Sequence, residues 1–126
     1  MMELYRIREV DFQHKDVRGC LTQLIHSGYA QVNVLESKKG ATRGTHFHRE
    51  ATEAFYLIVG SVETVLVGKD SSERVVFQKG DFFEIPPNVL HNMMFLEESL
   101  MVQMYSIPVE REDGTKDFFV EEEFYA

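Results

Sequence analysis

Four residues of the metal-ligand type lie at short, ordered spacings in the chain: His46, His48, Glu53 and His91. His46 and His48 are two positions apart, so on a strand their side chains project from the same face, about 6.6 Å from each other. Glu53 stands at the start of the next expected strand, and a turn at residues 86–88 directs His91 back toward the same point. Three neutral imidazoles and one carboxylate suit zinc, manganese, iron, nickel or copper. The pattern predicts one divalent metal ion, zinc as the first choice, bound by all four side chains.

β-Strands must position these side chains, because helical periodicity is nearly absent. Short runs rich in Val, Ile, Phe, Tyr and Thr recur between Gly, Pro, Asn and Asp, which is typical of an all-β sandwich or barrel. Strands are expected near residues 4–10, 20–26, 30–36, 42–48, 53–59, 62–68, 73–78, 82–85, 90–96 and 100–107. Gly60-Ser61 is predicted to form a tight hairpin turn and residues 68–72 a looser one, while Pro86-Pro87-Asn88 must turn the chain. Ten short strands without crossover helices favour a closed or double-sheet roll.

Length and composition fit one domain over residues 1–126. Apolar residues make up 44% of the 126 positions and aromatic residues 12%, enough for a filled core. No apolar run approaches the roughly 20 residues of a membrane helix, and the first ten residues carry charges where an export signal needs an apolar stretch. The only cysteine, Cys20, excludes an internal disulfide and fits a reducing cytosol. A cytoplasmic protein is therefore expected.

Net charge argues against a nucleic-acid partner, since the chain carries −8 at pH 7 and phosphates require a cationic face. Positive charges nevertheless gather beside the histidine pair, at Lys38, Lys39, Arg43 and Arg49. One interpretation is a local anchor for an anionic substrate on an otherwise acidic protein. The other is a solvated turn.

Two longer motifs resemble those of the cupin superfamily. Residues 40–60, GATRGTHFHREATEAFYLIVG, are similar to the first cupin motif in all spacings, and residues 80–91, GDFFEIPPNVLH, are similar to the second. Asn88 stands where a glycine is usual, and Asn tolerates the left-handed backbone. Phe95 stands where an asparagine is common. The resemblance implies the cupin double-stranded β-helix, a jelly-roll barrel.

Three shorter motifs narrow the resemblance to cupins that act on nucleotide sugars: Asp16-Val17-Arg18-Gly19, Gln31-Val32-Asn33 and Arg43-Gly44-Thr45-His46. Similar landmarks occur in 4-keto-6-deoxysugar 3,5-epimerases, in 3,4-ketoisomerases and in the cupin domain of capsular-polysaccharide epimerase/reductases. The resemblance implies an isomerase or epimerase of keto-deoxysugar nucleotides in surface polysaccharide biosynthesis, acting by proton transfer next to a ketone.

The general base is ambiguous at this point. In the metal-free epimerases the resemblance assigns this role to the position of His46, yet a histidine bound to a metal cannot also accept a proton. With an ion present, the base would be another titratable residue, and the candidates are Tyr105, Glu63 and Glu84. For Tyr105 the alternative is a strand tyrosine that packs on the sheet.

Four polar residues are expected to hold the substrate. Arg43 and Lys39 would bind the diphosphate. Gln31 and Asn33 would bond sugar hydroxyls, or else be exposed polar residues of an edge strand.

Two other functions are compatible with the same residues. A metal ion bound by three histidines and one glutamate, with an open coordination position, suits a metal-dependent dioxygenase. A non-catalytic sugar-binding cupin would need only the pocket. A homodimer is expected, because free-standing cupins resemble subunits that exchange N-terminal strands and the apolar segment at residues 1–10 lacks a partner of its own.

Overall fold

The computed structural model describes residues 3–126, which form twelve strands and one short helix. The strands are β1 (Arg6–Ile7), β2 (Phe12–Asp16), β3 (Gly19–Gln23), β4 (Gln31–Ser37), β5 (Thr42–Phe47), β6 (Glu53–Val59), β7 (Ser61–Val67), β8 (Ser72–Gln78), β9 (Phe82–Ile85), β10 (Leu90–Phe95), β11 (Ser99–Tyr105) and β12 (Phe119–Val120), and the helix is α1 (Glu121–Tyr125). Across these residues, no helix has the length and apolar character needed to cross a membrane.

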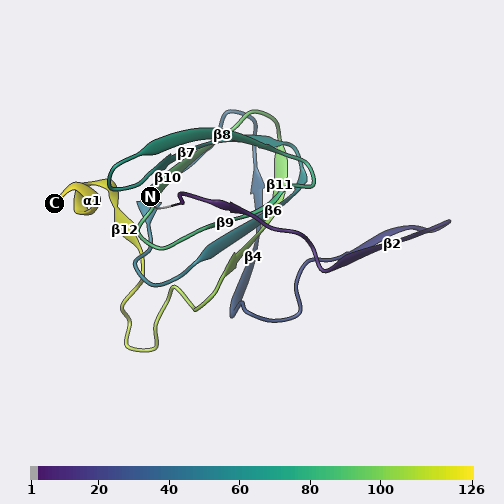
Figure 1. Cartoon of the computed structure of the whole chain (residues 1–126), viewed down its shortest axis with the longest axis horizontal. Helices are drawn as coiled ribbons and strands as arrows, with labels where there is room; N and C mark the ends of the chain where they lie inside the picture. Colours follow the sequence, from purple (N-terminus) through teal and green to yellow (C-terminus); the bar gives the residue numbers. More distant parts are fainter. Residues whose placement is uncertain (1–2) are drawn as a thin grey trace.

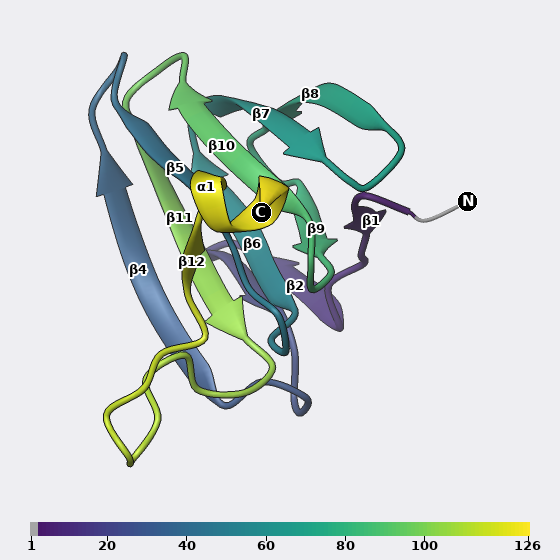
Figure 2. The same cartoon turned by 90° about the vertical axis from the view of Figure 1, so that its left-hand side faces the viewer.

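Two five-stranded antiparallel sheets enclose the interior of the protein (Figures 1 and 2). The strand order is β1-β9-β6-β11-β4 in one sheet and β12-β5-β10-β7-β8 in the other. Strands β2 and β3 form a separate hairpin that projects from the barrel on the side away from β12 and α1 (Figure 1). The chain alternates between the two large sheets from β4 to β7, which is the winding of a jelly roll.

Gly60 makes one of the crossings between the sheets. It lies between β6 and β7, which belong to opposite sheets, so the predicted tight hairpin at Gly60-Ser61 is wrong. Its φ is 103°, and a Cβ there would lie 2.1 Å from the Ser99 hydroxyl oxygen. The corner therefore requires glycine. The turn predicted at residues 68–72 does join a paired hairpin, that of β7 and β8.

The interior is apolar at one end of the barrel and polar at the other. Glu53, Phe55 and Leu57 alternate along the inward face of β6, and all three are buried. Phe55 and Leu57 belong to the main core cluster, in which the rings of Phe77 and Phe83 stack with centroids 3.6 Å apart. Glu53 ends this inward row, so β6 delivers a carboxylate to the polar end of the same interior.

The two departures from the cupin motifs have simple structural consequences. Asn88 has a φ of 64°, the left-handed conformation expected where a glycine is usual. Phe95 is fully buried in the main core cluster. An aromatic ring thus fills apolar space at a position where the motif commonly has a polar side chain.

The N-terminal segment differs from expectation. Leu4 packs in the main core, and β1 pairs with β9 of the same chain. The prediction that residues 1–10 lack a partner of their own is therefore wrong for the described part, and Met1 and Met2 lie outside it. Most expected strands appear within one or two residues of their predicted bounds, whereas β2, β12 and α1 were not expected.

Candidate active site

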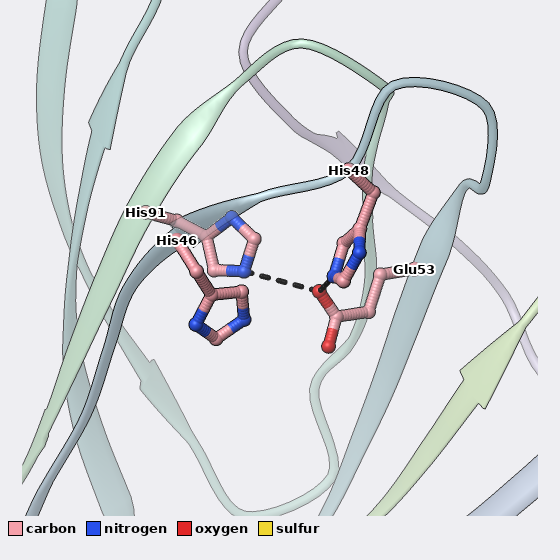
Figure 3. A group of neighbouring side chains, drawn as sticks. All are labelled: His46, His48, Glu53 and His91. Atoms are coloured by element: carbon pink, nitrogen blue, oxygen red, sulfur yellow. Dashed lines mark ion pairs between the residues drawn. The ribbon is translucent and has the colours of Figure 1, made fainter. Parts of the chain in front are cut away.

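The polar end of the barrel brings together the side chains of His46, His48, Glu53 and His91 (Figure 3). One ligand-type atom from each lies within 4.8 Å of the others. His46 and His91 face each other in the register of β5 and β10, whereas Glu53 comes from β6 in the opposite sheet. The predicted convergence of these four side chains is therefore present.

Gly44 allows β5 to approach β10 closely enough for this meeting. Its φ is 116°, and a Cβ there would lie 2.6 Å from the backbone oxygen of His91. Any other residue would push the two strands apart at the point where they present His46 and His91.

Glu53 lies between two of the histidines. Its Oε1 is 3.2 Å from His48 Nε2 and 3.0 Å from His91 Nε2, and its Oε2 accepts a hydrogen bond of 2.6 Å from Gln103 Nε2. Glu53, His91 and His48 are 1%, 2% and 3% exposed. A carboxylate without contact to water requires a compensating positive charge.

The backbone partners of the two histidines show where that charge comes from. Nδ1 of His48 contacts the carbonyl oxygen of Asp117 at 2.5 Å, and Nδ1 of His91 contacts that of Val89 at 3.0 Å. Because a carbonyl only accepts, each Nδ1 must carry a proton. A neutral ring would then present the Nε2 lone pair to Glu53 Oε1, which is repulsive. A proton on Glu53 Oε1 or on one of the two Nε2 atoms would remove this repulsion.

The directions of the pKa shifts favour the charged form of His48. Burial lowers the pKa of His48, but the hydrogen bond and charge of Glu53 outweigh burial and raise it overall. Burial also opposes ionisation of Glu53, yet the hydrogen bonds from His48 and His91 lower the pKa of Glu53 far below its ordinary value. The two shifts favour an ionised Glu53 beside a protonated His48.

His46 has a different environment from the other two histidines. Burial, together with the proximity of His91 and against the partial opposition of Glu53, lowers the pKa of His46 to about 4. Its ring stacks on Phe118 with centroids 4.8 Å apart and meets His91 edge to face at 4.6 Å. His46 is therefore neutral at pH 7 and able to accept a proton.

His46 lines an open cavity of about 480 Å³, a size typical of small-ligand pockets. The residues around it come from β4, β5, β11 and the C-terminal segment. They are Leu35, Thr42, Arg43, Gly44, Thr45, His46, Gln103, Tyr105, Phe118 and Val120.

Tyr105 lines the same cavity and stays protonated. It lies opposite Glu53 in the register of β11 and β6, and its ring meets that of His48 edge to face, with centroids 5.1 Å apart. Burial and the nearby charge of Glu53 raise the pKa of Tyr105 far above its usual value. The hydroxyl is thus a proton donor and not a base at neutral pH.

Two predicted catalytic candidates lie elsewhere. Glu63 is on the outer face of β7, where it forms an ion pair with Arg74, so Glu63 is withdrawn as a general base. Glu84 lies under the N-terminal segment, 2.5 Å from Arg6 and bonded to the Tyr29 hydroxyl. Neither carboxylate lines the cavity that contains His46.

The predicted substrate-binding residues divide between those near the cavity and those away from it. Arg43 lines the cavity, and Asn33 donates to Gln103 Oε1 at 2.9 Å, the amide that bonds Glu53. Gln31 instead accepts a hydrogen bond of 3.0 Å from the Val109 backbone. Lys39 is exposed in the turn between β4 and β5.

Three residues of the site were not anticipated: Gln103, Asp117 and Phe118. Gln103 shares a strand face with Tyr105, so the two-residue period of β11 would have placed it beside that candidate. Asp117 and Phe118 precede a two-residue strand, and a strand that short has no alternation to recognise.

Solved structures of sugar-nucleotide enzymes share this fold. A mutant of the 3,4-ketoisomerase QdtA from Thermoanaerobacterium thermosaccharolyticum, in complex with TDP-4-keto-6-deoxyglucose, matches with a TM-score of 0.81 at 21% identity, over 99% of this chain and 93% of that one. The TDP-quinovose 3,4-ketoisomerase WlaRB from Campylobacter jejuni matches with a TM-score of 0.81 at 17% identity, over 98% of both chains. The dTDP-4-dehydrorhamnose 3,5-epimerase from Sulfolobus tokodaii gives 0.65 at 19% identity, over 82% of this chain and 75% of that one.

The fold is therefore the cupin jelly roll, as the two motifs predicted. Residues 14–112 match the family of the polysaccharide biosynthesis C-terminal domain, and the chain belongs to that family. Among curated protein sequences, none matches it.

The prediction of a divalent metal cofactor, zinc or another ion, is wrong. The ketoisomerases and epimerases that share this fold are generally metal-independent. The physical reason lies in the three buried side chains of His48, Glu53 and His91. The pKa shifts favour an ion pair of Glu53 with a protonated His48, which would supply the positive charge for which an ion was expected and leave the nitrogens of His46 free.

Proposed function

We propose that this cupin is an isomerase or epimerase of keto-deoxysugar nucleotides in polysaccharide biosynthesis. The observation that carries the proposal is the contrast between the two kinds of histidine. His46 has a lowered pKa and lines the cavity, whereas His48 has a raised pKa and is buried outside the cavity lining. The chemistry named for the enzymes of the same fold, and the description of the family, agree with this assignment.

His46 is the general base in this proposal. It takes the proton from the carbon beside the ketone, the C–H electron pair becomes the C=C bond of an enolate, and the ketone oxygen gains the negative charge. An imidazole is a weak base for a carbon acid, so stabilisation of that oxygen is the larger contribution. The protonated Tyr105 hydroxyl, which lines the cavity, supplies it.

Return of the proton determines the reaction. Delivery to the same carbon from the opposite face inverts that centre and gives an epimer. Protonation of the neighbouring carbon, with loss of the hydroxyl proton of the enediolate, moves the ketone by one position. Tyr105 and His46 are the proton donors available on the cavity wall.

Arg43 is the anchor proposed for the diphosphate. Its guanidinium is held by the Ser37 hydroxyl and the Glu36 carbonyl oxygen, both at 2.9 Å, at the edge of the cavity. On a chain with net charge −8, a fixed cation at the entrance offsets the repulsion of an anionic substrate. Lys39, in the preceding turn, adds a second positive charge, and Asn33 with Gln103 offers amides to sugar hydroxyls.

Deuterium exchange tests the proposal. With TDP-4-keto-6-deoxyglucose in D₂O, the wild-type protein should place deuterium on a carbon next to the ketone, as read by NMR. The position of the ketone in the product separates ketoisomerisation from epimerisation. His46→Asn should abolish exchange, while His26→Asn, the same change at an exposed histidine outside the strands, should not. Binding of the nucleotide sugar without deuterium exchange would indicate a sugar-binding protein and refute the proposed enzymatic activity.

We also propose that the protein is a homodimer, on grounds different from those expected from sequence. The β2–β3 hairpin stands away from the barrel with Phe12, Val17 and Leu21 exposed. An isolated two-stranded hairpin is marginal in water and gains stability from a second surface. Its Asp16–Arg18 ion pair, a landmark shared with nucleotide-sugar cupins, lies away from the chain's own cavity. A monomeric mass by light scattering at all concentrations would contradict the dimer.

A further inference from the structure

The C-terminal segment crosses the active site, although it lies beyond residues 14–112, the part that matches the family. β12 pairs with β5, with Phe119 opposite Phe47 and Val120 opposite His46. Figure 2 shows β12 beside β5, with α1 continuing from it. The two residues that precede β12, Asp117 and Phe118, each contact a histidine of the site.

Asp117 connects His48 to the loop that leads to Glu53. Its side chain is fully buried, and its carboxylate oxygens accept the backbone N–H groups of residues 49, 50 and 51 at 2.7, 3.1 and 2.8 Å. Its own carbonyl oxygen accepts the Nδ1 proton of His48. One residue thus fixes the loop between His48 and Glu53 and the ring orientation that presents Nε2 to the carboxylate.

Phe118 is the corresponding partner of His46. In the part of the chain that the structure describes, the ring nitrogens of His46 make no hydrogen bond to protein, so ring contacts alone orient it. A catalytic base is usually oriented by a third, hydrogen-bonding group. Here the stacked phenyl ring, inclined by 29° to the imidazole, takes that place. Phe118 is 45% exposed, so its outer face is not required by the core.

We propose that Asp117 and Phe118 form a positioning strap for the active site, in which Asp117 fixes the orientation of His48 and Phe118 that of His46. The strap is held at both ends: the Asp117 backbone N–H donates to the Val109 carbonyl at 2.9 Å, and β12 continues the sheet beyond Phe118. Its effect on rate rests on the proposed function, whereas its effect on ring orientation does not.

Substitution of Phe118 tests the contact with the base. Phe118→Leu should lower kcat for deuterium exchange about 10- to 100-fold with KM within about 3-fold, because a misplaced base loses rate and not affinity. Phe118→Tyr, which keeps the stack, should retain kcat. Tyr125→Leu, an exposed aromatic of the same C-terminal segment without a site histidine beside it, is the control. A raised KM with unchanged kcat in Phe118→Leu would show that Phe118 only lines the cavity and does not orient His46. That result would overturn the proposal.

Substitution of Asp117 tests the contact with His48 without any substrate. In protein with ¹⁵N-labelled histidine, the wild-type His48 ring should show a fixed proton on Nδ1. Asp117→Asn should replace that signal with an exchanging mixture, and Asp113→Asn, in the exposed preceding turn, should leave it unchanged. A folded Asp117→Asn protein with wild-type ring signals and rate would refute the strap.

Failures of the strap and of the enzyme assignment remain distinguishable. If the wild-type protein exchanges no deuterium, the proposed function falls, and the His48 ring signals still decide the strap. If Asp117→Asn does not fold, the comparison of Phe118→Leu with Phe118→Tyr tests the strap instead. If exchange occurs and Phe118→Leu matches the wild type in kcat, only the strap is refuted.

Discussion

Replacing Glu53 by glutamine removes the negative charge at the centre of the site while keeping its shape. The wild-type carboxylate is 1% exposed and lies within 3.2 Å of two imidazole nitrogens. Loss of one partner from a buried ion pair costs about 3–5 kcal/mol. An amide at this position would also turn an NH₂ group toward either His48 or the Gln103 donor. We expect Glu53→Gln to lower the free energy of unfolding by about 3 kcal/mol or more.

Denaturant unfolding at several pH values measures this effect. The pKa of Glu53 is lowered by folding, so its contribution is present above its unfolded pKa, about 4.3, and is lost as pH falls. The pKa of His48 is raised, so its contribution is fully present below about 6.5 and is lost as pH rises through the folded pKa. The difference between wild type and Glu53→Gln should therefore be largest between about pH 4.3 and pH 6.5.

Glu63→Gln is the matched control for this prediction. It removes the same charge from β7, where Glu63 and Arg74 form a partly exposed pair. Surface pairs of this kind contribute about 0–1 kcal/mol. If Glu53→Gln costs no more than Glu63→Gln, or if its cost is constant from pH 3 to pH 8, Glu53 is not the charged partner of an imidazolium and the reasoning fails.

Three other substitutions or conditions test separate parts of the site. With a pKa of about 4 at His46, kcat/KM for exchange at pH 5 should stay close to its value at pH 7, whereas a base of pKa 6.5 would leave about 4% of the value at pH 7; a fall to that level would contradict the assignment. Gly44→Ala should destabilise the fold by at least about 2 kcal/mol in denaturant, while Gly40→Ala, also at positive φ but with nothing within 4 Å, should cost only about 1 kcal/mol; equal losses would refute the close approach. Arg43→Ala should raise KM for the nucleotide sugar about 10-fold or more with little change in kcat, and an unchanged KM would remove Arg43 as the diphosphate anchor.

The fold was predictable because its signals are local. Proline and glycine interrupt the chain between short β-branched and aromatic runs, and nearly every expected strand forms. Local sequence patterns do not identify which strands pair with each other in the sheets. Gly60 shows this, since a glycine between two apolar runs looks the same in a hairpin as at a crossing between sheets. The two residues of β12 are too few for any period, and β12 forms because it extends the edge beside β5.

The meeting of the four side chains was predictable from spacing, but its chemistry was not. His46, His48, Glu53 and His91 give the same sequence pattern whether an ion or a proton balances the carboxylate. The difference lies in contacts from distant residues, above all the Asp117 carbonyl that fixes the Nδ1 proton of His48 across 69 positions of sequence. The outward position of Glu63 could have been predicted from the sequence, because the residues of β7 alternate between apolar and polar.

In the proposed site, protons and no metal ion carry the charge, and His46 is free to accept a proton from carbon. The most direct measurement is the rate of deuterium incorporation from D₂O into TDP-4-keto-6-deoxyglucose before and after exhaustive dialysis of the protein against a chelator. We predict that the dialysed protein retains the full rate and that added zinc does not raise it. A rate that disappears on dialysis and returns with a divalent ion would contradict the account.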